Sequence, residues 1–330
     1  MKIDDSRADL THCTTLQLPF SAAAVTTFRS ESELSILAEQ IKNFPRFFIL
    51  GGGSNCVARE FWDGLLIFVK NRGIEVLESD GFFHLNIAAG EVWANVVRFA
   101  LSCNIFGLEN LAGIPGLVGG AAVQNIGAYG AEIADFVESL QVFDLKEKKM
   151  RTLPKSACDF HYRHSIFKTA KNSFLVVRVK LKLPKKWQAN CRYSSLQFKE
   201  KENPTPFAIF KAVLCARAQK LPDTKRAPNL GSFFKNPTVN SKKFSKIQNI
   251  LPNVVFWKNG ENFKLSAAFL IEAAGLKGIV AHGFAMSAQH ALVLENKGGN
   301  RATLEKFVSM IQQSIQSKYG VFLEVEPVFM

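Results

Sequence analysis

Glycine residues gather in two segments of this chain, and their density suggests contact with a bound phosphate. The first segment reads Gly51-Gly52-Gly53-Ser54-Asn55, and the second runs from Gly107 to Gly130. Glycine weakens helices and strands, so such density needs a backbone reason, either positive φ or close approach to a ligand. A diphosphate lying against bare backbone N–H groups supplies that reason. We therefore expect the two segments to hold a dinucleotide.

Two familiar nucleotide motifs are absent from these segments. Neither segment contains G-x-G-x-x-G before a helix, and neither contains Gly-Lys-Ser or Gly-Lys-Thr. A Rossmann dehydrogenase and a P-loop kinase are therefore disfavoured. A pair of irregular turns is the structural alternative, but two glycine clusters with Gln124, Asn125 and Tyr129 among them favour ligand binding.

The elements that must position these glycines follow from apolar spacing. Ser30 and Glu33 form a capping box ahead of a helix that Pro45 stops, and residues 46–50 predict a buried strand leading directly into Gly51. Residues 174–183 alternate between apolar and basic side chains, as in a half-buried strand. Further strands are predicted at 65–70, 82–89, 136–152 (two runs) and 321–329, and helices at 91–103, 207–219, 266–274 and 303–318. The pattern predicts an α+β protein.

Composition indicates an ordinary folded protein. The 330 residues are 47% hydrophobic and 21% charged, which suits two or three domains. The first nine residues carry three aspartates and no apolar run, and no apolar stretch reaches the length of a membrane span. We expect a soluble protein. The six cysteines are scattered without a C-x-x-C pair, which favours reduced thiols and no metal site.

The net charge of +13 raises the possibility of a nucleic-acid partner. Lys and Arg are spread along the chain in small groups, however, and no helix-turn-helix, zinc finger or aromatic RNA-binding motif accompanies them. An anionic small substrate or a solvated basic surface accounts for the charge more simply. We expect neither a nucleic-acid nor a membrane partner.

Several motifs in order along the chain resemble the UDP-N-acetylenolpyruvoylglucosamine reductase family. They comprise the segment Gly51–Asn55, Gly107-Leu-Glu-Asn-Leu-Ala-Gly-Ile-Pro-Gly116, Gln124-Asn-Ile-Gly-Ala-Tyr-Gly130, Tyr162-Arg-His-Ser-Ile-Phe-Lys168, Gly231-Ser-Phe-Phe-Lys-Asn-Pro237, Leu276-Lys-Gly278 and Glu324-Val-Glu326. Each motif alone is weak, but their order from residue 51 to 326 is specific. The segment around Tyr193 resembles the substrate loop of the longer of two subclasses.

The resemblance implies a fold and a domain plan. The fold is α+β, with an FAD-binding part of the vanillyl-alcohol-oxidase type and a separate substrate-binding domain. Residues 1–72, joined by the C-terminal strand 321–330, would form one FAD-binding subdomain, and 73–219 the second. Residues 220–320 would bind the UDP-sugar, in agreement with the turn signal at Leu221-Pro222-Asp223.

The resemblance also implies a reaction. NADPH would reduce FAD, and the flavin would pass a hydride to the enolpyruvyl ether of the UDP-sugar, giving UDP-N-acetylmuramate for peptidoglycan in the cytoplasm. Arg163 matches the family's cation beside the substrate carboxylate, where a guanidinium can stabilise developing negative charge. Ser232 matches the proton donor, and a C-terminal glutamate is the third catalytic residue. It aligns with Glu326, although Glu324 would lie on the same side of a strand.

Binding residues are carried over from the same motifs. Tyr193, Lys220, Asn236 and Lys277 would contact the UDP-sugar and its diphosphate. Gly120-Ala121-Ala122 replaces hydroxyl side chains of some members, so backbone N–H groups would act there. The FAD contacts implied are Gly51, Gly52, Gly53, Ser54, Asn55, Gly116, Gly119, Gly120, Gln124, Asn125, Gly127 and Tyr129. We expect a monomer. Two alternatives are another flavin oxidoreductase of this fold that acts on a different substrate and, ranked last, a non-catalytic protein that binds phosphate or nucleic acid.

Overall fold

The computed structural model describes residues 2–4, 8–170, 173–191, 196, 198 and 203–330. The chain forms two compact units. Unit 1 contains Met1–Ala8, Ala22–Gly53 and Phe61–Arg217, and unit 2 contains Asp9–Ser21, Ser54–Glu60 and Ala218–Met330. Each unit has its own cluster of buried apolar side chains. The boundary at Ala218 lies close to the turn signal near residue 220, and the finer division of the flavin-binding part stays a prediction.

A small parallel sheet in unit 1 leads into the first glycine segment. Its strands lie in the order β1 (Ser21–Phe28), β4 (Phe61–Val69) and β2 (Phe47–Leu50), with β2 parallel to β4. The capping box of Ser30 and Glu33 is confirmed, but the first turn is a 3₁₀ helix and α1 begins only at Leu34 (Leu34–Ile41). The chain then enters β2, which ends at Leu50, directly before Gly51.

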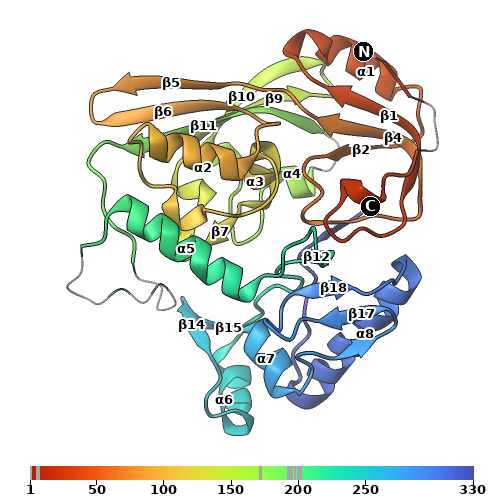
Figure 1. The fold of residues 1–330 in the computed structure, drawn as a ribbon, viewed down its shortest axis with the longest axis vertical. Coiled ribbons are helices and arrows are strands. Elements are labelled where there is room, and N and C mark those ends of the chain that lie inside the picture. The colour runs from red at the N-terminus through yellow and green to blue at the C-terminus, as the bar shows by residue number, and fades with distance from the viewer. Residues whose placement is uncertain (1, 5–7, 171–172, 192–195, 197, 199–202) are drawn as a thin grey trace. The chain divides into compact units, whose positions relative to one another are not determined.

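The larger sheet of unit 1 carries the second glycine segment on one face. Its antiparallel order is β10 (Lys149–Pro154), β9 (Val137–Asp144), β11 (Phe174–Pro184), β6 (Phe82–Ala88) and β5 (Ile74–Ser79). Helices α2 (Trp93–Ser102) and α3 (Val118–Gln124) cover this face (Figure 1). Strand β11 alternates between buried apolar and more exposed basic residues over its second half, as its sequence predicts.

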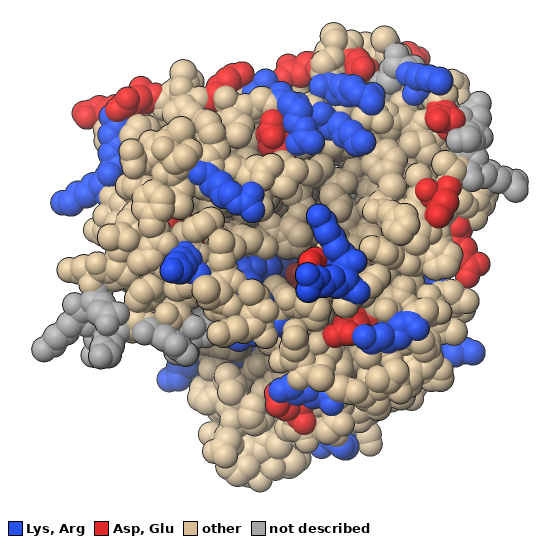
Figure 2. Space-filling model, in the orientation of Figure 1, with Lys and Arg blue, Asp and Glu red and all other residues tan. Residues whose placement is uncertain are grey.

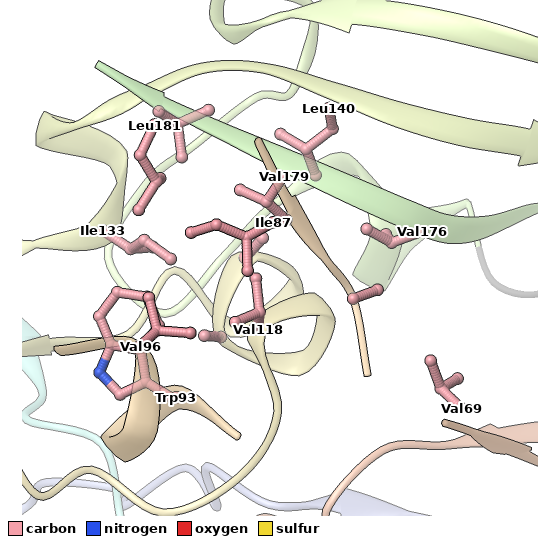
Figure 3. Close-up of a cluster of buried hydrophobic side chains, with 14 of the residues drawn as sticks. Val69, Ile87, Trp93, Val96, Val118, Ile133, Leu140, Val176, Val179 and Leu181 are labelled. Atoms are coloured by element: carbon pink, nitrogen blue, oxygen red, sulfur yellow. The ribbon is translucent and has the colours of Figure 1, made fainter. Parts of the chain in front are cut away.

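The core between sheet and helices is densely filled. Trp93 and Val96 of α2 and Val118 of α3 point toward Ile87 and Val179 of the sheet (Figure 3). All five side chains are fully buried. The Trp93 ring nitrogen donates to the carbonyl oxygen of Leu111 at 2.9 Å, so its one polar group is satisfied. This packing fixes the 3₁₀ turn η3 (Glu109–Leu111) within the glycine segment.

Unit 2 combines small antiparallel sheets with helices. One sheet has the order β12 (Asn229–Leu230), β18 (Leu294–Asn296), β17 (Phe284–Met286), β16 (Val280–Ala281), and another has β13 (Thr238–Val239), β15 (Asn262–Leu265), β14 (Phe256–Asn259). The helices are α6 (Ser241–Ile250), α7 (Ala267–Ala273) and α8 (Arg301–Tyr319), while α5 (Pro206–Lys220) begins in unit 1 and ends in unit 2. The predicted helices at 266–274 and 303–318 correspond to α7 and α8.

The C-terminal strand is shorter than the sequence predicts. Only β19 (Val328–Phe329) forms, and it pairs in parallel with β3 (Cys56–Val57) of unit 2. The preceding residues meet the chain at Phe234 through an isolated bridge to Val325. A continuous strand over 321–329 is therefore wrong, because this segment has different partners on the two sides of Pro327.

The remaining sequence expectations concern metal, thiols and charge. No described group of three His, Cys, Asp or Glu side chains could hold a metal ion, and no described helix has the length and apolarity to cross a membrane. The six cysteines, all within the described residues, form no disulfide; Cys103 and Cys215 are exposed, and Cys56 and Cys158 are buried. Figure 2 shows Lys and Arg scattered over the visible face, with acidic side chains among them.

Candidate functional site

The two glycine-rich segments contact each other in unit 1. A Cβ atom on Gly52 would lie 2.8 Å from the Cα atom of Gly116, a distance that real side chains do not reach. Gly53 and Gly116 have positive φ values of 62° and 110°. Only glycine combines such backbone angles with so close an approach. The bare backbones that a dinucleotide requires therefore come together from two distant parts of the sequence.

Two neighbouring glycines of α3 have different surroundings. Gly119 is packed against Ala89, to whose carbonyl oxygen its N–H donates at 2.9 Å. The N–H of Ala121 donates to Leu117 at 2.8 Å. Gly120 is exposed, and a Cβ atom there would meet nothing within 4 Å. Gly120 therefore offers the open backbone in this stretch, whereas Gly119 permits close packing.

A tight hairpin forms the end of the second glycine segment. Strands β7 (Gly127–Ala128) and β8 (Ala131–Glu132) flank Tyr129 and Gly130, whose φ values are 48° and 83°. Positive φ at both central residues is typical of a type I′ turn. The turn presents Tyr129 at its tip, one of the expected flavin contacts.

Two asparagines that sequence reasoning missed hold this turn. The buried Asn110 donates through Nδ2 to the carbonyl oxygens of Tyr129 at 2.8 Å and Asn190 at 2.9 Å. Asn190 in turn donates to the carbonyl oxygen of Gly130 at 3.0 Å. The Oδ1 atom of Asn190 is buried without a hydrogen-bond partner among the described residues. The only available signal was the position of Asn110 within the Gly107–Gly116 motif.

Gln124 and Asn125 lie between these glycines and the arginine motif. Asn125 is fully buried with a left-handed backbone, and its side chain bonds Glu132, the carbonyl oxygen of His161 and the N–H of Ala134. It supports the loop from within. Gln124 accepts a hydrogen bond from Lys168 at 3.0 Å. Both side chains thus connect the second glycine segment to the residues on either side of Arg163, His161 and Lys168.

Arg163 projects from the tip of a second tight turn in unit 1. His161 and His164 form a bridge, and Arg163 between them has a φ of 54°. Strained angles at residues other than glycine concentrate at functional sites. Its guanidinium donates to the carbonyl oxygen of Gly127 at 2.9 Å and packs over the Tyr162 ring, 5.1 Å from the centroid. The structure therefore brings the predicted catalytic arginine to the predicted flavin segment.

In unit 2, the Ser232 segment is paired with the C-terminal glutamates. Ser232 is exposed, and the carbonyl oxygen of its neighbour Phe233 accepts the N–H of Glu326 at 2.9 Å. Glu326 is half-buried. Glu324 instead forms an ion pair with Lys235 at 3.1 Å, and its side chain is 68% exposed. The two glutamates therefore have different surroundings, since Glu324 is exposed and ion-paired whereas Glu326 is half-buried beside Phe233, and the assignment of Glu326 as the catalytic residue stays a prediction.

The end of the first glycine motif reaches the same part of unit 2. The carbonyl oxygen of Asn55 accepts the N–H of Val328, two residues after Glu326, at 3.0 Å. The half-buried Ser54 precedes it. Parallel pairing of β3 with β19 continues this contact. Expected cofactor-binding and catalytic residues are therefore adjacent within unit 2.

The two predicted diphosphate lysines share a neighbour. Burial lowers the pKa of His290 below its usual 6.5, and the charges of Lys220 and Lys277 lower it further, while Glu272 opposes them. Lys277 forms an ion pair with Glu272 at 2.8 Å. An open cavity has a volume of about 390 Å³. Its lining includes Gly278 and Gln289, which are the sequence neighbours of Lys277 and His290. A basic, partly buried group such as this suits a diphosphate.

The other two residues expected to contact the substrate are Asn236, which the structure describes, and Tyr193, which it does not. Asn236 accepts the N–H of Ala267 at 2.9 Å, so its side-chain oxygen anchors the start of α7. Tyr193 lies outside the described residues. Its contribution stays a prediction.

Known proteins resemble this chain along most of its length. Residues 222–330 match the family described as UDP-N-acetylenolpyruvoylglucosamine reductase, C-terminal domain, and residues 22–152 match an FAD binding domain. The UDP-N-acetylenolpyruvoylglucosamine reductase of Pseudoalteromonas translucida is 42% identical over 285 residues, covering 86% of this chain and 84% of that protein. The UDP-N-acetylenolpyruvoylglucosamine reductase of Shewanella oneidensis is 37% identical over 329 residues, which cover 94% of this chain and 96% of that protein.

A solved structure shows the same fold. The UDP-N-acetylenolpyruvylglucosamine reductase of Thermus caldophilus aligns over 99% of both chains with a TM-score of 0.68 and 24% identity. The predicted α+β fold with an FAD-binding part is confirmed. Since relatives more than 30% identical cover over two thirds of the sequence, the chain belongs to the UDP-N-acetylenolpyruvoylglucosamine reductase family.

Proposed function

We propose that this protein reduces the enolpyruvyl ether of UDP-N-acetylglucosamine enolpyruvate to UDP-N-acetylmuramate, with NADPH as reductant and FAD as cofactor. The observation that carries the proposal is the hydrogen bond from Arg163 to Gly127, which joins the candidate catalytic cation to the candidate flavin segment. Family membership supports the substrate class. The reaction would serve peptidoglycan precursor synthesis in the cytoplasm.

The residues of unit 1 fit a flavin dinucleotide. The Gly52–Gly116 contact leaves bare backbone on both segments, and Gly120 faces open space. We assign Gly51, Gly52, Gly53, Ser54, Asn55, Gly116, Gly119, Gly120, Gln124, Asn125, Gly127 and Tyr129 to this cofactor, with Asn125 as a supporting residue. When bound, FAD supplies hydride transfer between NADPH and the substrate.

Three side chains carry the remaining chemistry. Arg163 holds the substrate carboxylate and stabilises the negative charge that develops beside it when the vinyl group gains a hydride. Ser232, exposed at its turn, donates a proton to the neighbouring carbon. Glu326, whose backbone N–H donates to the carbonyl oxygen of Phe233 beside that serine, is the third catalytic residue. Lys220, Lys277, Asn236 and Tyr193 bind the UDP-sugar, and the two lysines supply positive charge to its diphosphate.

Anaerobic titration tests this function. NADPH should bleach the flavin absorption of the purified protein, and the enolpyruvyl UDP-sugar should restore it with formation of UDP-N-acetylmuramate. A flavin that NADPH reduces but only oxygen reoxidises, with an alcohol or hydroxy acid as the better substrate, would overturn the assignment.

Light scattering after gel filtration tests the proposed monomer, and binding to duplex DNA at rising salt tests the absence of a nucleic-acid partner.

A further inference from the structure

A single carboxylate closes the turn from which Arg163 projects. The Oδ1 atom of Asp159 lies 2.8 Å from Nε2 of His161, and its Oδ2 atom lies 3.3 Å from Nε2 of His164. The two imidazole rings stack, with 6.0 Å between their centroids and an angle of 24° between their planes. His161 and His164 form the bridge on either side of the turn, so one carboxylate ties both of its ends.

The backbone of this turn is strained at two residues. Arg163 has a φ of 54°, and Asp159 has a φ of 48°. Such left-handed angles are unfavourable for residues other than glycine unless the surrounding contacts compensate, and aspartate tolerates them better than arginine. Two backbone hydrogen bonds between His161 and His164, at 3.0 and 3.2 Å, close the turn. The Asp159 carboxylate adds a second, side-chain closure that restrains Arg163 at the tip.

The base of the loop is anchored by other contacts. The carbonyl oxygen of Cys158, which is fully buried, accepts the N–H of Ile166 at 2.9 Å. The side chains of Asp159 and His161, by contrast, are 55% and 71% exposed. Exposed ion pairs contribute little to the stability of a whole protein. The carboxylate therefore acts on the conformation of the turn more than on the folding of unit 1.

We propose that Asp159 is a positioning residue for Arg163. By holding His161 and His164 together, it fixes the direction in which the guanidinium leaves the turn, toward the carbonyl oxygen of Gly127 at 2.9 Å. This inference rests on the proposed function, in which Arg163 holds the substrate carboxylate and stabilises the charge that develops beside it. A cation with these tasks must be kept closely in its productive position, so a looser turn would weaken both.

Ligand binding tests the effect on the substrate carboxylate. Asp159→Asn keeps the size of the side chain but leaves one acceptor oxygen for two histidines. Calorimetry on the FAD-loaded variant should show about three- to tenfold weaker binding of UDP-N-acetylmuramate, which carries a carboxylate, because one or two exposed charge-assisted contacts are lost. UDP-N-acetylglucosamine, which lacks that carboxylate, should bind as it does to the wild type. Asp63→Asn is the control, since Asp63 is also exposed and pairs with Arg46 at 3.9 Å.

Stopped-flow kinetics separate positioning from a general structural role. Arg163 acts when the substrate accepts the hydride, so Asp159→Asn should slow reoxidation of the flavin by the enolpyruvyl UDP-sugar about three- to tenfold. Reduction of the flavin by NADPH and the melting temperature should stay unchanged. In a variant with both His161→Gln and His164→Gln, Asp159→Asn should have no further effect, because the carboxylate has already lost both partners.

The opposite results would overturn the positioning role. They are unchanged binding of UDP-N-acetylmuramate, equal slowing of the two half-reactions, a lower melting temperature, or an additive effect of Asp159→Asn in the double-histidine variant. If the enolpyruvyl UDP-sugar does not reoxidise the wild-type flavin, the proposed function itself fails, and this inference fails with it.

Discussion

At the scale of single residues, the contact between Gly52 and Gly116 gives the sharpest test of the flavin site. Gly52→Ala places a methyl group 2.8 Å from the Gly116 Cα atom, so the two segments must separate. We expect FAD affinity to fall by at least about tenfold, the effect of losing one or two backbone hydrogen bonds to a charged ligand. Flavin reconstitution measures the loss.

Gly51→Ala is the matched variant for this test. A Cβ atom on Gly51 meets no protein atom within 4 Å, so the free protein should keep its melting temperature. Any loss of FAD affinity in Gly51→Ala then reflects contact between the added methyl group and the bound FAD, and not a change in the protein. Normal FAD binding by Gly52→Ala would contradict a cradle built from both segments.

The two C-terminal glutamates should respond differently to neutralisation. Glu326→Gln should lower turnover roughly 100-fold, the low end for a group in proton transfer. Glu324→Gln should change it less than about fivefold, the factor that corresponds to the roughly 1 kcal/mol upper limit for an exposed ion pair. Stopped-flow reduction of the flavin by NADPH should be normal in both variants. Equal losses of turnover would remove the distinction between them.

His290 predicts a pH dependence of stability. Its pKa is lowered in the folded state from 6.5, so the unfolded chain binds the proton more tightly. The neutral form contributes stability above about pH 6.5, and this contribution is lost as the pH falls through the folded pKa. Urea titrations between pH 8 and 5 should therefore show a smaller decline for His290→Gln than for the wild type. Parallel declines would show that His290 titrates as an ordinary exposed histidine.

At the scale of elements, the β7–β8 hairpin depends on side chains from outside it. Asn190→Asp keeps the shape but replaces the donor to Gly130 by a carboxylate that repels its carbonyl oxygen. We expect FAD affinity to fall about five- to tenfold as the Tyr129 turn loosens. Asn95→Asp is the control, because Asn95 is an exposed residue of α2 whose side chain accepts a hydrogen bond from Arg98. Unchanged FAD affinity in Asn190→Asp would show that the turn holds itself.

The success of sequence reasoning also varies by element. Strand β2, strand β11, and helices α7 and α8 were predictable, because apolar period and caps are local signals. Helix α6 was missed, since it buries only Phe244 and Ile247 among its lysines. The C-terminal strand was overestimated, because the pairing of residues 321–329 depends on distant partners. Asn110 and Asn190 act through contacts with residues 19 to 80 positions away, which no local pattern reveals.

At the scale of the whole molecule, two separate apolar clusters should behave as independent sources of stability. Ile87 belongs to the cluster of unit 1 and Ile311 to that of unit 2, and both are fully buried. Each Ile→Val change should lower the free energy of unfolding by about 0.5–1.5 kcal/mol. The double variant should lose the sum within about 0.5 kcal/mol, measured by circular dichroism in urea. A larger deviation would mean that the clusters are energetically coupled.

The distribution of thiols has a practical consequence for such experiments. Burial raises the pKa of Cys56 to about 12 and that of Cys158 to about 11, so neither forms an appreciable thiolate at neutral pH. Cys103 and Cys215 are exposed and should react with maleimides first. Cys215 lies on α5. After Cys103→Ser, a fluorophore on Cys215 would therefore label α5 at a single position and report changes in the surroundings of that helix.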